Sequence, residues 1–449
     1  MKIVWHTRSV VGLMNRIIKN KLLPLILASL LAISINAHAE VRRSKVISIY
    51  DNPKYGADFS HFAYVNPKAP QGGKITMPAY GGFDSFNPFI FKGIASPEVA
   101  ALTLDSLGVI PTDDETSVYP LIAKEFEIPD DHSFIGFIID EKAKFSDGSK
   151  ITADDVVFSF DSIIKKGAPF YKIYYADIKK IEKINDYHVR FYFNPNSTNK
   201  ELPLILAQLK IFSAKDWEHK DFSTPSLQPP LGSGPYILER FSPSKFLIFK
   251  KNNNYWGKDL PSRKGFFNFA EVRYDYYQDT TVTLQALFAG EIDIREEYIA
   301  KNWVSGYNND IVKSGRIIKE EIRHNQPATL QFFGFNTRLP QFADRRVRQA
   351  IGLAFNFDWA NDKLFYNQYR RIDSYFANTV MAAKGLPQGK ELDILNKFKD
   401  QLPQAVFTEN PSVPSHKDYL QTRANLRQAV KLLQSAGYDF IDGKMTNLN

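Results

Sequence analysis

The sequence predicts an α/β protein with more than one lobe. Segments with helical periodicity and segments with strand alternation follow one another in irregular order, which favours α/β lobes over a single barrel. The chain has 449 residues, a length sufficient for about two or three cores. A stretch rich in Ser and Pro at residues 223–230 indicates a boundary between two of them.

The N-terminus has the three parts of a secretory signal peptide. Residues 1–21 contain basic side chains and no acidic one, residues 22–35 form an apolar run, and Ala37, His38 and Ala39 form a small-x-small cleavage site. The apolar run is shorter than the ~20 residues that a membrane-spanning helix needs. We therefore expect residues 1–39 to be removed after Ala39 and the mature protein to reach the periplasm of a bacterium.

Composition narrows the classes of function. The net charge of +8 includes five Lys and Arg of the predicted signal peptide, so the mature chain carries about +3. A strongly basic chain would favour nucleic-acid binding, and the mature chain is not strongly basic. The chain contains no Cys, which excludes disulfides, a thiol nucleophile and a lipidated N-terminal Cys. We expect a soluble protein without a lipid anchor and without a nucleic-acid partner.

Residues 144–160, KFSDGSKITADDVVFSF, predict a tight turn followed by a capped helix. Thr152 is expected to cap the helix and Asp155 to complete a capping box. The helix is expected to end at Gly167. A metal or acid–base role for the paired Asp154 and Asp155 is the alternative, and capping is favoured because both lie in the first helical turn.

The remaining elements follow from periodicity and from turn residues. Strands are expected at residues 74–77, 187–193, 236–241, 246–250, 292–294, 329–335 and 437–441. Helices are expected at residues 96–107, 280–289, 345–355 and 423–436, with Asp344 as the cap of the third. Residues 403–414 are expected to form a loop punctuated by Pro.

Catalytic motifs are scarce in the sequence. The H-E-x-x-H, Walker A and G-x-S-x-G motifs do not occur, and the eight His share no metal-ligand spacing. Ser242 and Lys245 match the S-x-x-K motif of penicillin-binding enzymes, but no K-T-G follows, so a turn between two strands is favoured. We expect no enzymatic activity, no metal and no cofactor, with a serine hydrolase using Ser242 and Lys245 as the less favoured alternative.

Several motifs occur in the order in which one protein family carries them. They are GG at 72–73, FDSFNP at 83–88, the block at 144–160, GSGPY at 232–236, NYWG at 254–257, GEID at 290–293, FNT at 335–337 and RVRQAI at 346–351. With these motifs the chain resembles the extracellular solute-binding proteins of family 5, the peptide-binding components of ABC importers. Residues 54–73, 370–376 and 385–387 resemble the YejA-like branch, which is associated with oligopeptide and microcin C uptake.

The resemblance implies a two-lobed periplasmic-binding-protein fold of type II, in the family-5 cluster, with a ligand cleft between lobes that close by hinge motion. Residues 40–87 and 223–318 are expected to form the core of lobe I, residues 88–222 an extra subdomain of lobe I, and residues 319–449 lobe II. Family members continue beyond the position that matches Asn449. Lobe II is therefore expected to be incomplete, and a truncated, non-functional remnant of such a receptor is an alternative.

The implied function is the capture of oligopeptides by a monomer, which delivers them to an inner-membrane ABC permease and its ATPase subunits. An extended peptide would form main-chain hydrogen bonds in the cleft. Three segments are expected to line it: Lys92, Gly93, Ile94 and Ala95; Tyr171, Tyr174 and Tyr175; and Arg295, Glu296 and Glu297. The first would offer backbone groups, the second a wall, and the third partners for a peptide's amine and carboxylate. Ordinary surface or core roles are the alternative for each segment.

Overall fold

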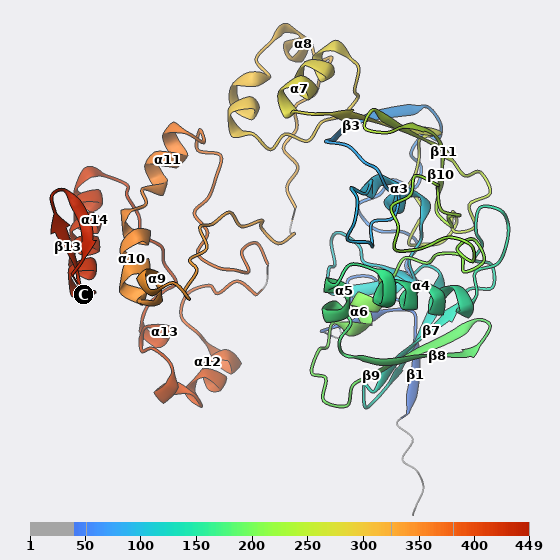
Figure 1. Cartoon of the computed structure of the whole chain (residues 1–449), viewed down its shortest axis with the longest axis horizontal. Helices are drawn as coiled ribbons and strands as arrows, with labels where there is room; N and C mark the ends of the chain where they lie inside the picture. Colours follow the sequence, from blue (N-terminus) through green and yellow to red (C-terminus); the bar gives the residue numbers. More distant parts are fainter. Residues whose placement is uncertain (1–39, 51, 325, 380, 449) are drawn as a thin grey trace, which may run out of the picture.

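The computed structural model describes residues 40–448 except 51, 325 and 380 (Figure 1). The predicted signal peptide at residues 1–39, with its cleavage site, lies outside the described residues. Figure 1 shows the blue to yellow elements on one side of the molecule and the orange and red elements on the other. Among the residues that the structure describes, no helix combines the length and the apolarity needed to cross a bilayer.

Segments distant in the sequence share one four-stranded sheet. Its strands are, in spatial order, β10 (Tyr236–Ser242), β11 (Phe246–Lys251), β12 (Glu271–Tyr277) and β3 (Lys74–Tyr80). Neighbours are antiparallel except β12 and β3, which are parallel. Helix α3 (Pro97–Thr103) packs on this sheet through the fully buried Val99. The sheet therefore joins the chain around residue 80 to the chain after residue 235.

The GSGPY motif packs against the end of α3. The Gly234 N–H donates to the Thr103 carbonyl at 2.8 Å, and a Cβ added at Gly232 would lie 2.1 Å from that oxygen. Glycine permits this close approach of two backbones. The predicted helix at residues 96–107 ends at Thr103 because Leu104 takes an extended conformation at this contact.

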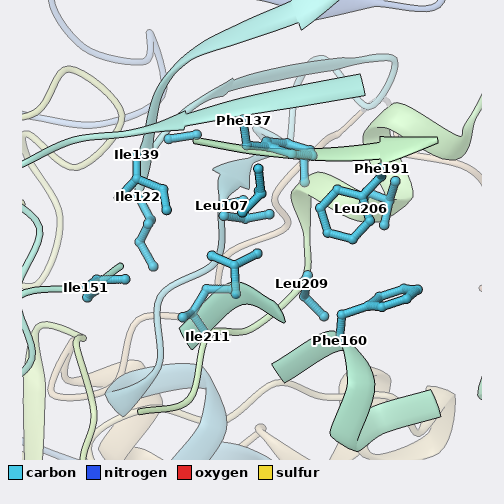
Figure 2. Packing of buried hydrophobic residues seen from close by; sticks show 14 of the residues in the cluster. Leu107, Ile122, Phe137, Ile139, Ile151, Phe160, Phe191, Leu206, Leu209 and Ile211 are labelled. Carbon is cyan, nitrogen blue, oxygen red and sulfur yellow. The ribbon is translucent and has the colours of Figure 1, made fainter. Parts of the chain in front are cut away.

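A second sheet is antiparallel throughout and has five strands. In spatial order they are β1 (Val41–Ser44), β6 (Ala123–Pro129), β7 (Phe134–Ile139), β9 (His188–Phe193) and β8 (Ile178–Asn185). Helices α4 (Ala153–Lys166), α5 (Phe170–Tyr174) and α6 (Leu202–Ala207) lie along one face of this sheet (Figure 1). Figure 2 shows Phe160 of α4 facing Phe137 and Phe191 of the strands across a buried cluster. A small sheet of β2 (Ile47–Ser48), β5 (Ser117–Pro120) and β4 (Gly108–Val109) adjoins this part.

The predicted capped helix is confirmed in α4. The Thr152 N–H and hydroxyl donate to one Asp155 carboxylate oxygen at 2.8 and 3.0 Å. The other Asp155 oxygen accepts from the Ala214 N–H at 2.9 Å. Asp154 points outward and pairs with Lys183 at 2.8 Å. The two aspartates therefore anchor the helix and its neighbours, as the capping interpretation predicts.

Residues 280–318 form a small helical unit. Helix α7 (Thr280–Ala289), the π-helical turn η1 (Asn302–Gly306) and α8 (Asp310–Lys313) surround a separate apolar cluster that includes Leu284 and Leu287. The prediction of a strand at residues 292–294 is wrong, since these residues form a loop. Asp293 instead bridges the edge strand β3: its N–H donates to the Thr76 carbonyl at 2.8 Å, and its carboxylate accepts from the Thr76 N–H at 2.7 Å.

Residues 319–448 contain helices and one hairpin. The helices are α9 (Pro340–Ala343), α10 (Arg345–Ala354), α11 (Phe357–Lys363), α12 (Gly389–Asn396), the short turn η2 (Lys399–Gln401), α13 (Ala405–Thr408) and α14 (Tyr419–Ser435). Helix α10 packs against α14, and Asp344 caps α10 as predicted by accepting from the Arg346 N–H at 2.8 Å. Strands β13 (Tyr438–Ile441) and β14 (Lys444–Asn447) form the hairpin, so the strand predicted at residues 437–441 is confirmed.

Two predictions in this part are wrong. Residues 329–335 are irregular rather than a strand, and Phe332 and Phe333 are 74% and 82% exposed. A strand needs a neighbour for its backbone groups, and no strand among the described residues pairs with this segment. The loop predicted at residues 403–414 contains α13, one helical turn that follows Pro403.

Candidate ligand-binding site

The first predicted segment, residues 92–95, is a loop fastened to the FDSFNP motif. The Ile94 N–H donates to the Asp84 carboxylate at 2.6 Å, and the Ile94 carbonyl accepts from the Asp84 and Ser85 N–H groups at 2.9 and 3.2 Å. Gly93 has a φ of +82°, and a Cβ there would lie 2.7 Å from Asp84 Oδ1. The backbone groups of Ile94 are therefore engaged within the chain, while its side chain is exposed.

The three tyrosines of the second segment occupy three different environments. Tyr175 is 7% exposed and belongs to the buried cluster, with its ring 5.4 Å from that of Phe160. Tyr171 is half-buried against Phe89, with 5.6 Å between ring centroids. Burial raises the pKa of Tyr171 and of Tyr175, so both phenols stay protonated at neutral pH. Of the three, only Tyr174 is exposed enough to contact a ligand.

Phe89 brings the first two segments together. Its carbonyl accepts from the Ala168 N–H at 2.7 Å just before α5, and its ring contacts Tyr171. Residues 84–95 and α5 are therefore held next to each other by a backbone hydrogen bond and by ring packing. The two segments form one continuous part of the molecule although about eighty residues separate them in the sequence.

In the third segment, Arg295 and Glu297 pair with each other. Their side chains are 1% and 2% exposed and form a buried ion pair. Arg295 also donates to the Tyr307 hydroxyl at 2.9 Å and to Thr283 Oγ1 at 3.0 Å, and the Tyr307 hydroxyl donates to Glu297 at 3.1 Å. Burial alone would lower the pKa of Arg295, but its interactions with Glu297 and Tyr307 together outweigh burial and the pKa is raised.

Glu296 points the other way, and its carboxylate accepts from the hydroxyl of the exposed Tyr298. The segment is fixed to the end of β3 through Thr283, whose hydroxyl also lies 3.1 Å from the Tyr80 hydroxyl. Of the two carboxylates and one guanidinium predicted to meet a peptide, only the Glu296 carboxylate lies at the surface. Among the described residues, no hydrogen bond, ion pair or ring contact joins residues 295–297 to residues 92–95 or 171–175.

Exposed apolar side chains flank these segments and were missed by the sequence reasoning. Phe91, Phe170, Ile173 and Tyr298 are all exposed, beside Ile94, Tyr174 and Glu296. Helix α5 has the sequence FYKIY, in which apolar residues occupy more positions than one buried face can hold. This excess of apolar residues in α5 was the sequence signal that could have predicted its exposed apolar side chains.

Two hollows among the described residues are too small for a peptide. The larger has a volume of about 160 Å³ and lies beside α7 and α8, with Asp293 and Arg316 in its lining. Pockets that enclose ligands usually measure at least roughly 300 Å³.

The S-x-x-K motif forms the turn between β10 and β11, where the Lys245 N–H donates to the Ser242 carbonyl at 3.0 Å.

Comparison with known proteins identifies the family. Residues 117–447 match the family described as bacterial extracellular solute-binding proteins, family 5 Middle. The chain is 37% identical to the "Uncharacterized protein YejA" of Escherichia coli strain K12. This alignment of 414 residues covers 92% of this chain and 68% of that protein. It is 36% identical to the "Probable peptide-binding protein YejA" of Agrobacterium fabrum, over 96% of this chain and 71% of that protein.

A solved structure shows the same fold. The oligopeptide-binding protein AppA from Bacillus subtilis, in complex with a nonapeptide, matches with a TM-score of 0.59 and 18% identity, over 85% of this chain and 67% of that one. The predicted α/β solute-binding fold and the predicted resemblance are thereby confirmed. This chain belongs to the bacterial extracellular solute-binding proteins of family 5.

Proposed function

We propose that this chain captures oligopeptides and delivers them to an ABC permease. Two comparisons support the proposal: a relative that aligns with 96% of the chain is named as a probable peptide-binding protein, and a protein of the same fold holds a nonapeptide. The structural observation that carries it is that apolar side chains are exposed in or beside each of the three predicted segments, at Ile94, Tyr174 and Tyr298. Such side chains bury apolar surface against many different peptides.

The proposed setting is the periplasm, where a soluble monomer would pass its ligand to an inner-membrane permease with ATPase subunits. Residues 40–87 and 223–318 would form the core of lobe I, residues 88–222 its extra subdomain and residues 319–449 lobe II. Lys92, Gly93, Ile94, Tyr174 and Glu296 are the exposed residues among the predicted site residues. No covalent chemistry is needed for this role.

Peptide-dependent stabilisation tests the proposal. The purified chain is heated with a panel of peptides of two to nine residues, and its apparent Tm is followed. A ligand at a hundred times its Kd should stabilise the native state by about 2.7 kcal/mol. Mass spectrometry of the recovered peptides should show them unchanged. A folded chain whose Tm responds to none of the peptides would contradict the proposal, and peptide cleavage that disappears in Ser242→Ala would favour the hydrolase instead.

A further inference from the structure

The small helical unit of residues 280–318 contains the larger of the two hollows. Helices α7 and α8, in the yellow part of Figure 1, line this hollow together with the loops that follow them. Its volume is about 160 Å³, and its apolar lining consists of Leu287, Phe288, Ile292, Ile311 and Ile317. A cavity of about 150 Å³ with such a lining is able to hold a benzene ring. The hollow therefore has room for one branched aliphatic or aromatic side chain.

Two opposite charges complete the lining of the hollow. Asp293 and Arg316 both border it, and both residues are exposed. Asp293 is held by β3, because its Oδ2 accepts from the Thr76 N–H at 2.7 Å and its own N–H donates to the Thr76 carbonyl at 2.8 Å. Its Oδ1 makes no hydrogen bond with another described residue. One carboxylate oxygen of fixed position is therefore free to accept from a ligand.

Arg316 supplies the cation of this rim. Gly315, with a φ of +76°, reverses the chain after α8, and its N–H donates to the Val312 carbonyl at 3.0 Å. This turn places Arg316 at the hollow beside Ile317. Among the described residues, the Arg316 guanidinium forms no ion pair or hydrogen bond, and so it does not pair with Asp293. The rim therefore presents a separate cation and a separate anion beside an apolar lining.

We propose that this hollow binds a free α-amino acid whose apolar side chain is about the size of that of leucine. The side chain would fill the hollow, the ammonium group would donate to Asp293, and the carboxylate would accept from Arg316. A neutral apolar molecule would leave both rim charges unmatched, and a simple acid or amine would match only one of them. The site goes beyond the proposed peptide binding, because its lining includes none of the residues of the three predicted segments.

Equilibrium dialysis of the purified chain against radiolabelled L-leucine tests the proposal. Leucine should bind saturably, and unlabelled analogues that each lack one recognised group should compete poorly. Leucinamide lacks the carboxylate, 4-methylpentanoate lacks the ammonium group, and glycine lacks the apolar side chain. Each should compete at least about tenfold more weakly than leucine, because it loses either a charged hydrogen bond or the burial of its side chain.

Two pairs of variants locate the site. Ile311→Trp places a larger side chain in the hollow and should weaken leucine binding at least about tenfold. Ile318→Trp makes the same change at a residue that is 82% exposed and outside the lining, so it should keep the wild-type affinity. Arg316→Gln should reduce the preference for leucine over leucinamide to less than about threefold, whereas Arg323→Gln, at another exposed position, should keep it. The Tm of each variant shows whether it folds, and Arg316→Gln serves if Ile311→Trp does not.

The outcomes separate this site from the proposed peptide site. A folded wild type that binds no leucine overturns the amino-acid site and leaves the proposed peptide binding intact. Equal competition by leucinamide, or a leucine affinity that survives in both Ile311→Trp and Arg316→Gln, also overturns it. Tri-leucine that competes as strongly as leucine would assign the hollow to the end of a peptide and overturn recognition of a free amino acid. Leucine binding that both variants weaken, while both controls keep it, supports the site whether or not the chain binds peptides.

Discussion

Replacing Asp105 with Asn should strongly destabilise the blue to yellow part of the molecule. Asp105 is 1% exposed, and its carboxylate accepts from Arg263 at 3.0 Å and from the Tyr255 hydroxyl at 2.9 Å. Asn has the same shape but no charge, so the Arg263 side chain, 13% exposed, would lose its counterion. Breaking a buried pair from one side costs about 3 to 5 kcal/mol.

A second buried cation near Asp105 should bring the loss of stability toward the upper end of the 3 to 5 kcal/mol range. Lys210 lies in the field of the same carboxylate, and burial lowers its pKa to about 8 even though Asp105 raises it. Without Asp105, two cations would share the buried region with no anion between them. The double variant Asp105→Asn with Arg263→Met removes one of them, so it should be more stable than Asp105→Asn alone.

Urea unfolding followed by tryptophan fluorescence provides the assay. The ring of Trp256 lies 6.2 Å from that of Tyr255, so its emission reports on this region. Asp259→Asn, at an exposed position of the same loop, is the matched control and should change stability by less than about 0.5 kcal/mol. An Asp105→Asn variant within about 1 kcal/mol of wild type, or a double variant less stable than the single one, would refute the argument.

Three further perturbations test other parts of the structure. Asp155→Ala removes the capping box of α4 and should cost about 1 to 2 kcal/mol in urea unfolding, whereas Asp154→Ala should cost less than about 0.5 kcal/mol. Burial would raise the pKa of Glu127, but Arg190 and His188 together outweigh it and lower the pKa below its usual 4.5, so the carboxylate stabilises the fold above that value. Its contribution should be lost as the pH falls through the lowered pKa, and Glu127→Gln should flatten this part of a Tm–pH profile. Gly93→Ala should cost at least about 1 kcal/mol, measured by thermal unfolding, because φ is +82° and the new Cβ meets Asp84.

Local sequence patterns correctly predicted the helices and strands whose stabilising contacts come from residues nearby in the sequence. Thr152 and Asp155 lie three residues apart and cap α4 without help from elsewhere, and β10 and β11 pair across a short turn. The strand predicted at residues 329–335 fails because its apolar alternation says nothing about whether a partner strand lies beside it. The same holds for residues 292–294, where an edge of β3 is met by one residue, Asp293, rather than by a strand.

In the candidate site, the sequence likewise predicted which segments matter but not which of their side chains are exposed. The sequence placed three tyrosines near each other, but burial separates Tyr175 in the core from Tyr174 at the surface, and helical spacing over five residues cannot decide which face is covered. Arg295 and Glu297 are two residues apart, a spacing that separates side chains on a helix but places them on one face of a strand. A loop brings them together, and loop conformation depends on contacts with Thr283 and Tyr307 that lie ten or more residues away.

Three aspartates of this part of the molecule hold distant backbone segments in place. Asp84 accepts from the Ile94 N–H, Asp293 from the Thr76 N–H and Asp155 from the Ala214 N–H. Each aspartate ties one segment to a distant one, and Asp155 uses both of its carboxylate oxygens in doing so. What the same segments leave exposed is apolar, as at Phe91 and Tyr298. Apolar contacts of this kind tolerate many different ligand side chains and need few charged groups to orient the ligand.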